Sequence, residues 1–466
     1  MSFFKKYIGT RTFYRRILIL MLPILLQNTI TNFTGLLDNL MVGRLGTEEM
    51  SGVSIVNQLF FVYNLCVFGL VSGTSLFGAQ SYGRGDHDGV RYTFRFGCYA
   101  ALPVLSIAFL LFIFAGDSLI SLYLHGQSDA GDLAYTLACA KDYLKIAMFG
   151  LIPYTISQIY AGSLRSVGRV LSPMVSGIIG FGVNVVLNYV LIFGSFGLPA
   201  LGVRGAAVAT VLARTAECLF LVLYTHLKRR EIPFIRGVYT SLYIPLSLAK
   251  QISVKGMPLL LNEGLFAFGF AMLNQSFSMR GLATVSAMNI TSTIYDSFNV
   301  LFISAGAAIA IVLGHVLGAG DTERAKDEAS KLCAFALFTG IAAGALLALS
   351  APFFPLLYNT SDEVRTLATS LILVRAFSSV FTGYLNGCYF TVRSGGKTIT
   401  TFLFDSCFVL GVKVPLSYLL ILYTDLSIIW VFLAVNATLI LKSVIGTILV
   451  ERGKWAVSLI GSEASQ

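Results

Sequence analysis

Residues 17–46 read ILILMLPILLQNTITNFTGLLDNLMVGRLG, an apolar stretch interrupted by one proline, several amides and one carboxylate. The pattern of this stretch returns without a gap in the second half of the chain, at a constant offset in numbering. The matched positions include Pro23 and Pro258, Asn39 and Asn274, Gly46 and Gly281, Ser51 and Ser286, and Asn64 and Asn299. A second echo, at a slightly smaller offset, pairs RSVGR (165–169) with RSGGK (393–397). The chain is therefore two copies of one apolar module, and membrane transporters commonly build two halves around a central site in this way.

The amino-acid composition places the chain in a lipid bilayer. Of its 466 residues, 56% are hydrophobic and only 12% are charged, whereas soluble domains average about 25% charged residues. The net charge of +10 comes from short loops, so it indicates membrane topology and not a nucleic-acid partner. The seven cysteines form no CxxC pair and the four histidines are widely separated. We therefore expect no disulfide framework, no zinc site and no cofactor.

The apolar stretches predict an all-α membrane protein with twelve transmembrane helices in two six-helix repeats. The expected spans are 17–42, 50–80, 93–115, 134–161, 170–194, 204–226, 257–278, 284–314, 331–352, 364–391, 398–422 and 425–449. Residues 1–226 then form an N-terminal lobe and residues 257–466 a C-terminal lobe. The basic and aromatic stretch 227–256 joins them, and we interpret it as a cytoplasmic crossover with a short helix lying on the lipid headgroups.

The distribution of basic residues predicts the orientation in the membrane. One side carries 23 of the 33 Lys and Arg residues, the other side carries 4, and 6 fall within spans. Both termini are therefore expected in the cytoplasm of a protein in the plasma membrane. The first apolar stretch is too long for a signal-peptide core, so we expect it to remain as the first span. An even number of spans gives the two repeats the same orientation.

The first span contains the strongest candidate for ion coupling. Pro23 removes a backbone hydrogen bond and predicts a hinge. Asn28, Asn32 and Asp38 follow it in the same span. A carboxylate within a span is costly and usually faces a wet cavity or a partner. The alternative for Asp38 is a headgroup-level acid paired with Arg44.

Two amides of the fifth span lie in a pattern that suits a cation site. Asn184 and Asn188 are four residues apart, so both side chains lie on one face of a helix. With Asp38 they would supply oxygen ligands for a sodium ion, although asparagines also join helices by hydrogen bonds. Thr210 of the sixth span is a weaker candidate, because it stands in a run of small residues.

The C-terminal half contains further acids within its spans. Glu263 lies one turn after Pro258, and Asp296 lies in the middle of the eighth span, so both are candidates for proton exchange or substrate binding. The alternative is a buried, paired acid with a structural role. Other embedded charges are expected to pair or to line the cavity: Arg214 with Glu217 three residues later, and Asp405 and Lys413, which are about two turns apart.

Several motifs together resemble one family. They are, in order, LLDNLMVGRLGTEEMSGVSI (36–55), LRSVGR (164–169), NVVLNYVLIFGSFGLPALGVRGAAVAT (184–210) and VLGAGD (316–321). This combination is similar to the multidrug and toxic compound extrusion (MATE) transporters, of bacterial type, over nearly the whole chain. The resemblance implies a V-shaped pair of six-helix lobes that exports organic cations and other amphipathic compounds against inward flow of sodium or protons. It implies a monomer in the lipid bilayer, with small molecules as its partners.

The resemblance also assigns roles to residues. Asp38 matches the family's cation-coupling acid, and Asn184, Asn188 and Thr210 match its polar positions in the fifth and sixth helices. Glu263 loosely matches an acid of the seventh helix, whereas Thr382 stands where some members have an acid. Many members have an acid at the position of Asn188. A sodium cage here would hold one carboxylate instead of two, which disfavours tight sodium binding.

Two other functions are open. A flippase for a lipid-linked saccharide precursor needs several cavity cations to hold a pyrophosphate, and the six cations within spans are scattered. A polytopic membrane enzyme needs a clustered catalytic set, which four isolated histidines do not supply. We therefore expect a transporter and not an enzyme.

Overall fold

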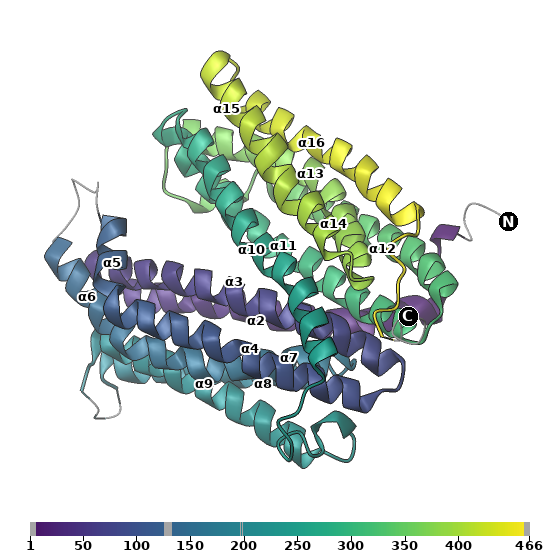
Figure 1. Ribbon diagram of the computed structural model, residues 1–466. Helices are drawn as coiled ribbons and strands as arrows, with labels where there is room; N and C mark the ends of the chain where they lie inside the picture. Colours follow the sequence, from purple (N-terminus) through teal and green to yellow (C-terminus); the bar gives the residue numbers. More distant parts are fainter. Residues whose placement is uncertain (1–5, 125–132, 196, 198, 461–466) are drawn as a thin grey trace. The chain divides into compact units, whose positions relative to one another are not determined.

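The structure is a computed structural model that describes residues 6–124, 133–195, 197 and 199–460. Within these ranges every regular element is a helix (Figure 1). The N-terminal half contains α2 (Arg11–Gly43), α3 (Thr47–Gly83), α4 (His87–Phe114), α5 (Gly116–Leu124), α6 (Leu133–Ala147), α7 (Leu151–Ser166), α8 (Leu171–Phe193) and α9 (Gly202–Leu227). The C-terminal half contains α10 (Leu246–Ser278), α11 (Leu282–Gly318), α12 (Thr322–Ser350), α13 (Asp362–Ser394), α14 (Thr398–Phe402), α15 (Val414–Tyr423) and α16 (Ile428–Glu451).

The helices confirm the class of protein that the apolar stretches predict. Eleven helices in the described ranges are long and apolar enough to cross a membrane. The remaining predicted span, 134–161, is wrong as a single helix, because a short 3₁₀ turn at Met148–Gly150 separates α6 from α7. Pro153 stands in the first turn of α7, where its missing N–H is tolerated, and it therefore favours a new helix start at this point.

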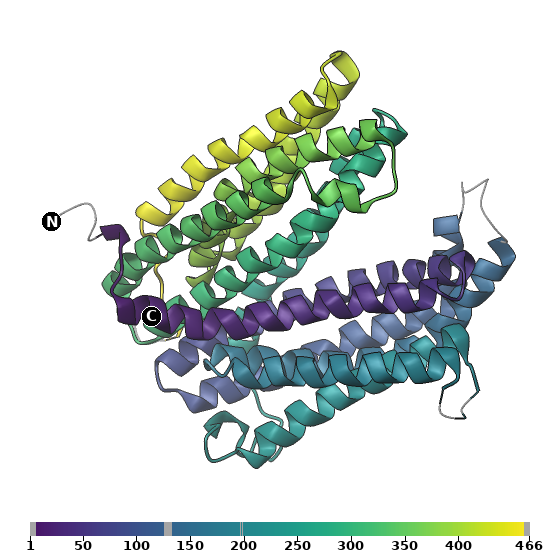
Figure 2. The ribbon, with the colours of Figure 1, turned by 180° about the vertical axis from the view of Figure 1, so that it is seen from behind.

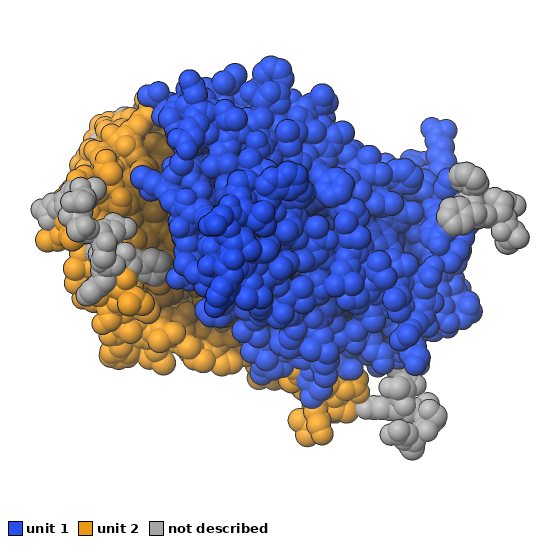
Figure 3. Space-filling view, turned by 90° about the horizontal axis from the view of Figure 1, so that it is seen from above, with its two compact units in different colours: residues 1–25, 79–86, 254–466 blue, residues 26–78, 87–253 orange. Residues whose placement is uncertain are grey.

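The chain divides into two compact units, coloured separately in Figure 3. Unit 1 contains residues 1–25, 79–86 and 254–466, and unit 2 contains residues 26–78 and 87–253. The expected boundary at 227–256 assigns residues 1–25 and 79–86 to the other lobe. Within each unit the long helices run side by side (Figure 2). The core of unit 2 includes Val56, Phe60 and Leu144, and the core of unit 1 includes Leu371 and Phe432.

Close backbone contact explains why the end of α3 belongs to unit 1. A Cβ atom at Gly318 of α11 would lie 1.9 Å from the backbone oxygen of Gln80. Only glycine permits helices to approach so closely. The Gln80 side chain also donates to the carbonyl oxygen of Ser394 at 2.8 Å. The turn after α11 is a helix end, and the Asp321 side chain accepts from the backbone N–H of Arg324 and caps α12.

The segment between the two sequence halves differs from the expected interfacial helix. Helix α9 continues to Leu227 and α10 already begins at Leu246, so the linker is 228–245 and its only helical turn in the structure is Pro233–Ile235. Phe234, Ile235 and Val238 are buried against α4, α7 and α9. Burial of these apolar side chains holds the linker on unit 2.

Arg95 of α4 fixes the shape of this linker. Its guanidinium donates to three linker carbonyl oxygens, those of Val238 at 2.7 Å, Gly237 at 2.9 Å and Tyr243 at 3.0 Å. Gly237 has a φ of 66°, which favours glycine, and it allows the chain to turn between two of these contacts. The linker is therefore an ordered part of unit 2.

Candidate functional site

The structure brings together three of the predicted residues of unit 2. Asp38 lies on α2, and Asn184 and Asn188 lie one turn apart on α8. The Asn188 side-chain N–H₂ donates to Asp38 Oδ1 at 2.5 Å and to Asn184 Oδ1 at 3.2 Å. The four-residue spacing on α8 thus places both amides at the same carboxylate.

This amide and carboxylate cluster is nearly enclosed by protein on its α8 side. Asn184 is 2% exposed and Asn188 is 1% exposed, while Asp38 is half-buried. No Lys, Arg or His in the described ranges lies within 4.0 Å of Asp38, although Arg214 acts on it from a longer distance. The Asn188 Oδ1 atom is buried and has no hydrogen-bond partner among the residues that the structure describes. The carboxylate therefore has polar support but lacks a direct counter-ion.

The other predicted residues of unit 2 have different surroundings. The Thr210 hydroxyl donates to the carbonyl oxygen of Ala206 in its own helix at 3.0 Å. Asn28 is half-buried and Asn32 is exposed, whereas Pro23 is buried inside α2, which continues through it. A hinge at Pro23 stays a prediction. The hydrogen bonds of Asp38 lead to α8 and not along α2.

Arg214 acts on Glu217 electrostatically, but the two residues do not form the expected direct ion pair in the described part of the chain. The Arg214 guanidinium lies 4.7 Å from the ring centre of Tyr154 in α7, and no ion pair within 4.0 Å joins the two residues in the described part of the chain. Glu217 lies instead toward α8, where its Oε2 would be 3.6 Å from a Cβ atom at Gly180. The aromatic ring attracts the guanidinium by a cation–π interaction, and the neighbouring glycine leaves room for the carboxylate.

Unit 1 contains a second polar cluster, and it is built around Asp405. Lys442 of α16 forms an ion pair with Asp405 Oδ1 at 2.8 Å. The Asn262 side-chain N–H₂ of α10 lies 3.3 Å from both Asp405 Oδ2 and the Tyr389 hydroxyl. The Ser406 hydroxyl lies 2.8 Å from the carbonyl oxygen and from the side-chain oxygen of Asn262. Asp405 thus pairs across helices, which is one of the two expectations for it.

An irregular backbone carries part of this cluster. Between α14 and α15, residues Leu403–Cys407 and Val409–Lys413 form π-helical turns that contain Asp405 and Lys413. Such turns are rare and are frequent at functional sites. Lys413 is half-buried and, among the described residues, makes no ion pair within 4.0 Å. Lys442, Arg375 and Asp405 all act on it electrostatically.

The two remaining acids that the sequence singled out in unit 1 lie near cations without direct contact. Glu263 is half-buried within electrostatic range of Arg393, and Asp296 is exposed within range of Arg375. Neither acid has a described cation within 4.0 Å. Arg375 itself lies over aromatic rings, 4.6 Å from the centre of Tyr295. No group of three His, Cys, Asp or Glu residues in the described ranges has the arrangement of a metal site.

Sequence reasoning did not identify Asn262, Tyr389 and Lys442 as site residues. A signal for two of them was present in the repeat. The offset that relates Pro23 to Pro258 also pairs Gln27 with Asn262. The offset that relates Arg165 to Arg393 also pairs Arg214 with Lys442. A comparison of every polar residue in the first half with its counterpart at these two offsets would have identified Asn262 and Lys442.

Comparisons with known proteins cover both repeats. The family model described as MatE matches residues 23–190 and 258–419. The probable multidrug resistance protein NorM of Thermotoga maritima is 24% identical over 467 residues, with 97% of this chain and 96% of the relative covered. The multidrug resistance protein MdtK of Pectobacterium atrosepticum is 27% identical over 431 residues, with 89% of each chain covered.

Solved structures share the fold. The MATE transporter VcmN of Vibrio cholerae, in its bent form, matches with a TM-score of 0.82 at 16% identity, covering 95% of this chain and 97% of that one. A MOP superfamily transporter from Pyrococcus furiosus matches with a TM-score of 0.81 at 20% identity, covering 95% and 96%. The fold agrees with these structures and the family match spans both halves, so this chain belongs to the MatE family of multidrug and toxic compound extrusion transporters.

Proposed function

We propose that the protein is a secondary active exporter of cationic and amphipathic small molecules, driven by inward flow of protons or sodium ions. The observation that supports this proposal most directly is the Asp38 carboxylate, which accepts a hydrogen bond from Asn188 and has no counter-ion within 4.0 Å among the described residues. A carboxylate without a fixed counter-ion can bind and release a small cation, whereas one in an ion pair is already neutralised.

Binding of the coupling ion would change the charge of the cluster that Asp38, Asn184 and Asn188 form. In the proposed cycle of alternating access, the ion and the drug bind with different affinities to the inward-facing and outward-facing states. Such a ligand shifts the equilibrium only through that difference in affinity. The resemblance of the chain to exporters named for multidrug resistance supports drugs as the substrates. The basic residues of one side support a plasma-membrane protein with cytoplasmic termini.

The number of acids in the cluster favours protons over sodium as the coupling ion. Asp38 is its one carboxylate, and Asn184 and Asn188 are neutral amides. Hard cations prefer carboxylate oxygens, so a sodium ion would find only one such group here. With a single acid in the cluster, a proton is enough to neutralise it.

The test is transport of a fluorescent cationic dye in proteoliposomes, with the pH and sodium gradients imposed separately. We expect dye movement to follow the pH gradient and to ignore the sodium gradient. Asp38→Asn should abolish gradient-driven movement while the protein stays folded. The control Asp425→Asn removes an exposed acid and should transport normally. Normal coupled export by Asp38→Asn would remove Asp38 from the mechanism, and strict sodium dependence would defeat the proton assignment.

A second candidate function is export of an anionic, lipid-linked precursor, and one feature of unit 1 favours it. Lys413 lies without an ion-pair partner among the described residues, within electrostatic range of Lys442 and Arg375. For the Pyrococcus furiosus transporter, a reversed polarity of the binding pocket is said to suggest a different function. If Lys413 holds an anionic group, Lys413→Gln should prevent binding of a lipid-linked pyrophosphate and leave dye export unchanged.

A further inference from the structure

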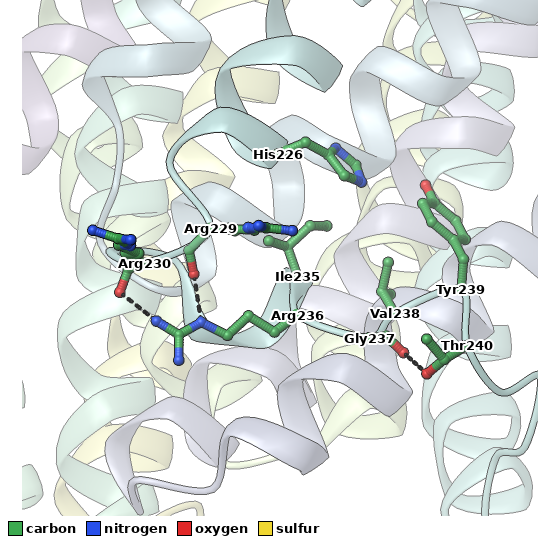
Figure 4. Close-up of a pocket in the computed structure, with 9 residues that line it drawn as sticks. All are labelled: His226, Arg229, Arg230, Ile235, Arg236, Gly237, Val238, Tyr239 and Thr240. Atoms are coloured by element: carbon green, nitrogen blue, oxygen red, sulfur yellow. Dashed lines mark hydrogen bonds between the residues drawn. The ribbon is translucent and has the colours of Figure 1, made fainter.

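The linker between α9 and α10 encloses a basic pocket that the proposed transport cycle does not use (Figure 4). The pocket has a volume of about 710 Å³ and lies where α9 ends and the linker folds back on it. Its walls include the side chains of His226, Arg229, Arg230, Arg236, Tyr239 and Thr240. A cavity of this size accommodates a small ligand.

The described residues that line the pocket include three arginines and no acid, so the pocket has an excess of positive charge. Glu231 forms ion pairs with Lys228 at 2.8 Å and with Arg169 at 2.9 Å. These two cations hold the pKa of Glu231 below its usual range, so it stays ionised and committed to them. Arg229 and Arg230 are exposed and, in the described ranges, form no ion pair within 4.0 Å.

Arg236 is positioned by the backbone, and one of its terminal nitrogens has no hydrogen-bond partner among the described residues. Its Nε donates to the carbonyl oxygen of Arg229 at 2.8 Å, and one terminal nitrogen, Nη2, donates to that of Arg230 at 3.2 Å. In Figure 4 the other terminal nitrogen makes no contact with the residues drawn. The Thr240 hydroxyl donates to the carbonyl oxygen of Gly237 at 2.8 Å, at the end of the pocket farthest from Arg230. The contacts from Arg95 hold this loop in place, so the pocket is formed before any ligand arrives.

Exposed residues of the linker and of the helix ends that flank it are typical of a membrane interface. Leu227 is 81% exposed, Leu242 is 72% exposed and Leu246 is 84% exposed, although each is strongly apolar. Tyr239 and Tyr243 are exposed as well. Exposed leucines and tyrosines beside arginines suit acyl chains on one side and headgroups on the other. A soluble phosphate compound would gain nothing from these apolar side chains.

We propose that this pocket binds the phosphate headgroup of an anionic phospholipid from the leaflet on the basic side of the protein. Arg229, Arg230 and the free nitrogen of Arg236 would contact the phosphate oxygens, because guanidinium groups donate in a geometry that matches phosphate. The exposed leucines would contact the acyl chains. Basic pockets at the cytoplasmic ends of membrane helices bind such headgroups in general.

The experiment is native mass spectrometry of the full-length protein, titrated in detergent with phosphatidylglycerol or with phosphatidylcholine. We expect the wild-type protein to retain phosphatidylglycerol in preference. The triple variant R229Q/R230Q/R236Q should bind it about 100-fold more weakly, since each basic residue near the headgroups contributes about fivefold. The single variant Arg230→Gln should bind phosphatidylglycerol about fivefold more weakly. It replaces the triple variant in the test if the triple variant is unstable.

The matched control is R84Q/K397Q/R452Q, which removes the same charge at exposed positions outside the pocket. It should bind phosphatidylglycerol like the wild type. Equal binding of the two lipids, or equal losses in both triple variants, would overturn the proposal. Competition by inorganic phosphate at the same concentration as the lipid would show an anion site without a lipid and would also overturn it. None of these outcomes depends on drug transport, so they test the pocket separately from the proposed export function.

Discussion

The two units each place an acid among helix-borne amides, but the two acids are held in opposite ways. In unit 2, Asp38 accepts a hydrogen bond from Asn188 and has no described cation within 4.0 Å. In unit 1, Asp405 forms an ion pair with Lys442 at 2.8 Å and accepts a hydrogen bond from Asn262. The first acid has no direct counter-ion in the described ranges, whereas the second has one from the protein. An internal repeat can therefore keep its fold while the polar clusters of its two copies differ in how their charge is compensated.

The repeat shows how this difference arose. Its second offset pairs Arg214 with Lys442, so both copies retain a cation at this position. Asp38 is paired with Leu273, and Asp405 is paired with Gly177, so the acid occupies a different helix in each copy. In unit 2 the Arg214 guanidinium lies over Tyr154, and in unit 1 the Lys442 ammonium contacts a carboxylate. The two acids therefore differ in whether the cation retained at this repeat position contacts them directly.

The largest effect is expected on the rate of dye export when Asp38 is replaced by a neutral residue, in contrast to removal of Asp405 with its partner. Asp38→Asn should lower the rate of gradient-driven dye export by at least about 100-fold, because the exchangeable charge is lost. The double variant D405L/K442M should retain export, because it removes an internally neutral pair. Export rates in proteoliposomes at equal protein content provide the measurement. If the double variant loses export to the same extent, the two acids are not different in role.

The next effect concerns stability, and it compares the loss of one member of the ion pair in unit 1 with the loss of both members. Asp405→Asn or Lys442→Gln alone should destabilise the protein by about 3–5 kcal/mol, because each leaves a charge within the membrane without its partner. D405L/K442M should cost much less, because it leaves no unpaired charge. Thermal unfolding in detergent gives the order of the three variants. Equal melting temperatures for the single and double variants would contradict a stabilising pair.

A smaller effect is expected when a substitution in unit 2 increases its apparent affinity for sodium. Asn188→Asp adds a second carboxylate beside Asp38 and supplies oxygen ligands where the wild type has an N–H₂ group. We expect an increase in apparent sodium affinity of about tenfold, because hard cations prefer carboxylate oxygens. The dependence of dye export on sodium concentration is the readout, with Asn184→Ser as the control. An unchanged sodium response would show that the number of carboxylates does not set the ion.

The smallest effect is expected at Lys413. Lys413→Gln removes a cation that has no ion-pair partner in the described ranges, so the export of a cationic dye should change by less than about twofold. A large loss would place Lys413 in the coupling machinery and would make the sites of the two units more alike than their ion pairs suggest. The measurement is the initial rate of export at a fixed pH gradient.

The sequence predicted the helical fold and the polar face of α8 because both depend on local periodicity. The spacing of Asn184 and Asn188 fixes their common face wherever the helix is regular. The partner of Asp405 could not be predicted in this way. Lys413 is about two turns away in the sequence, but the π-helical turns between them change the angle at which side chains leave the helix. The cation that reaches Asp405 comes from α16, and local spacing contains no information about such a contact.

The shape of the linker could not be predicted for a related reason. Its basic and aromatic composition is typical of a segment on lipid headgroups, and composition contains no information about a contact with Arg95. The guanidinium of this buried residue donates three hydrogen bonds to the linker backbone from α4, which is distant in the sequence. Leu242 and Tyr243 of the linker are exposed. A location of the linker on lipid headgroups stays a prediction.

The division of α2, α3 and α10 between the two units has a mechanical consequence. The chain passes from one unit to the other inside α2 after Leu25, inside α3 after Gly78 and inside α10 after Ser253. All three helices continue across these points, so no loop absorbs a change in the orientation of the units there. Such a change would store elastic energy as bending of these helices. Their stiffness, and not only ion affinity, would then set the speed of a transport cycle.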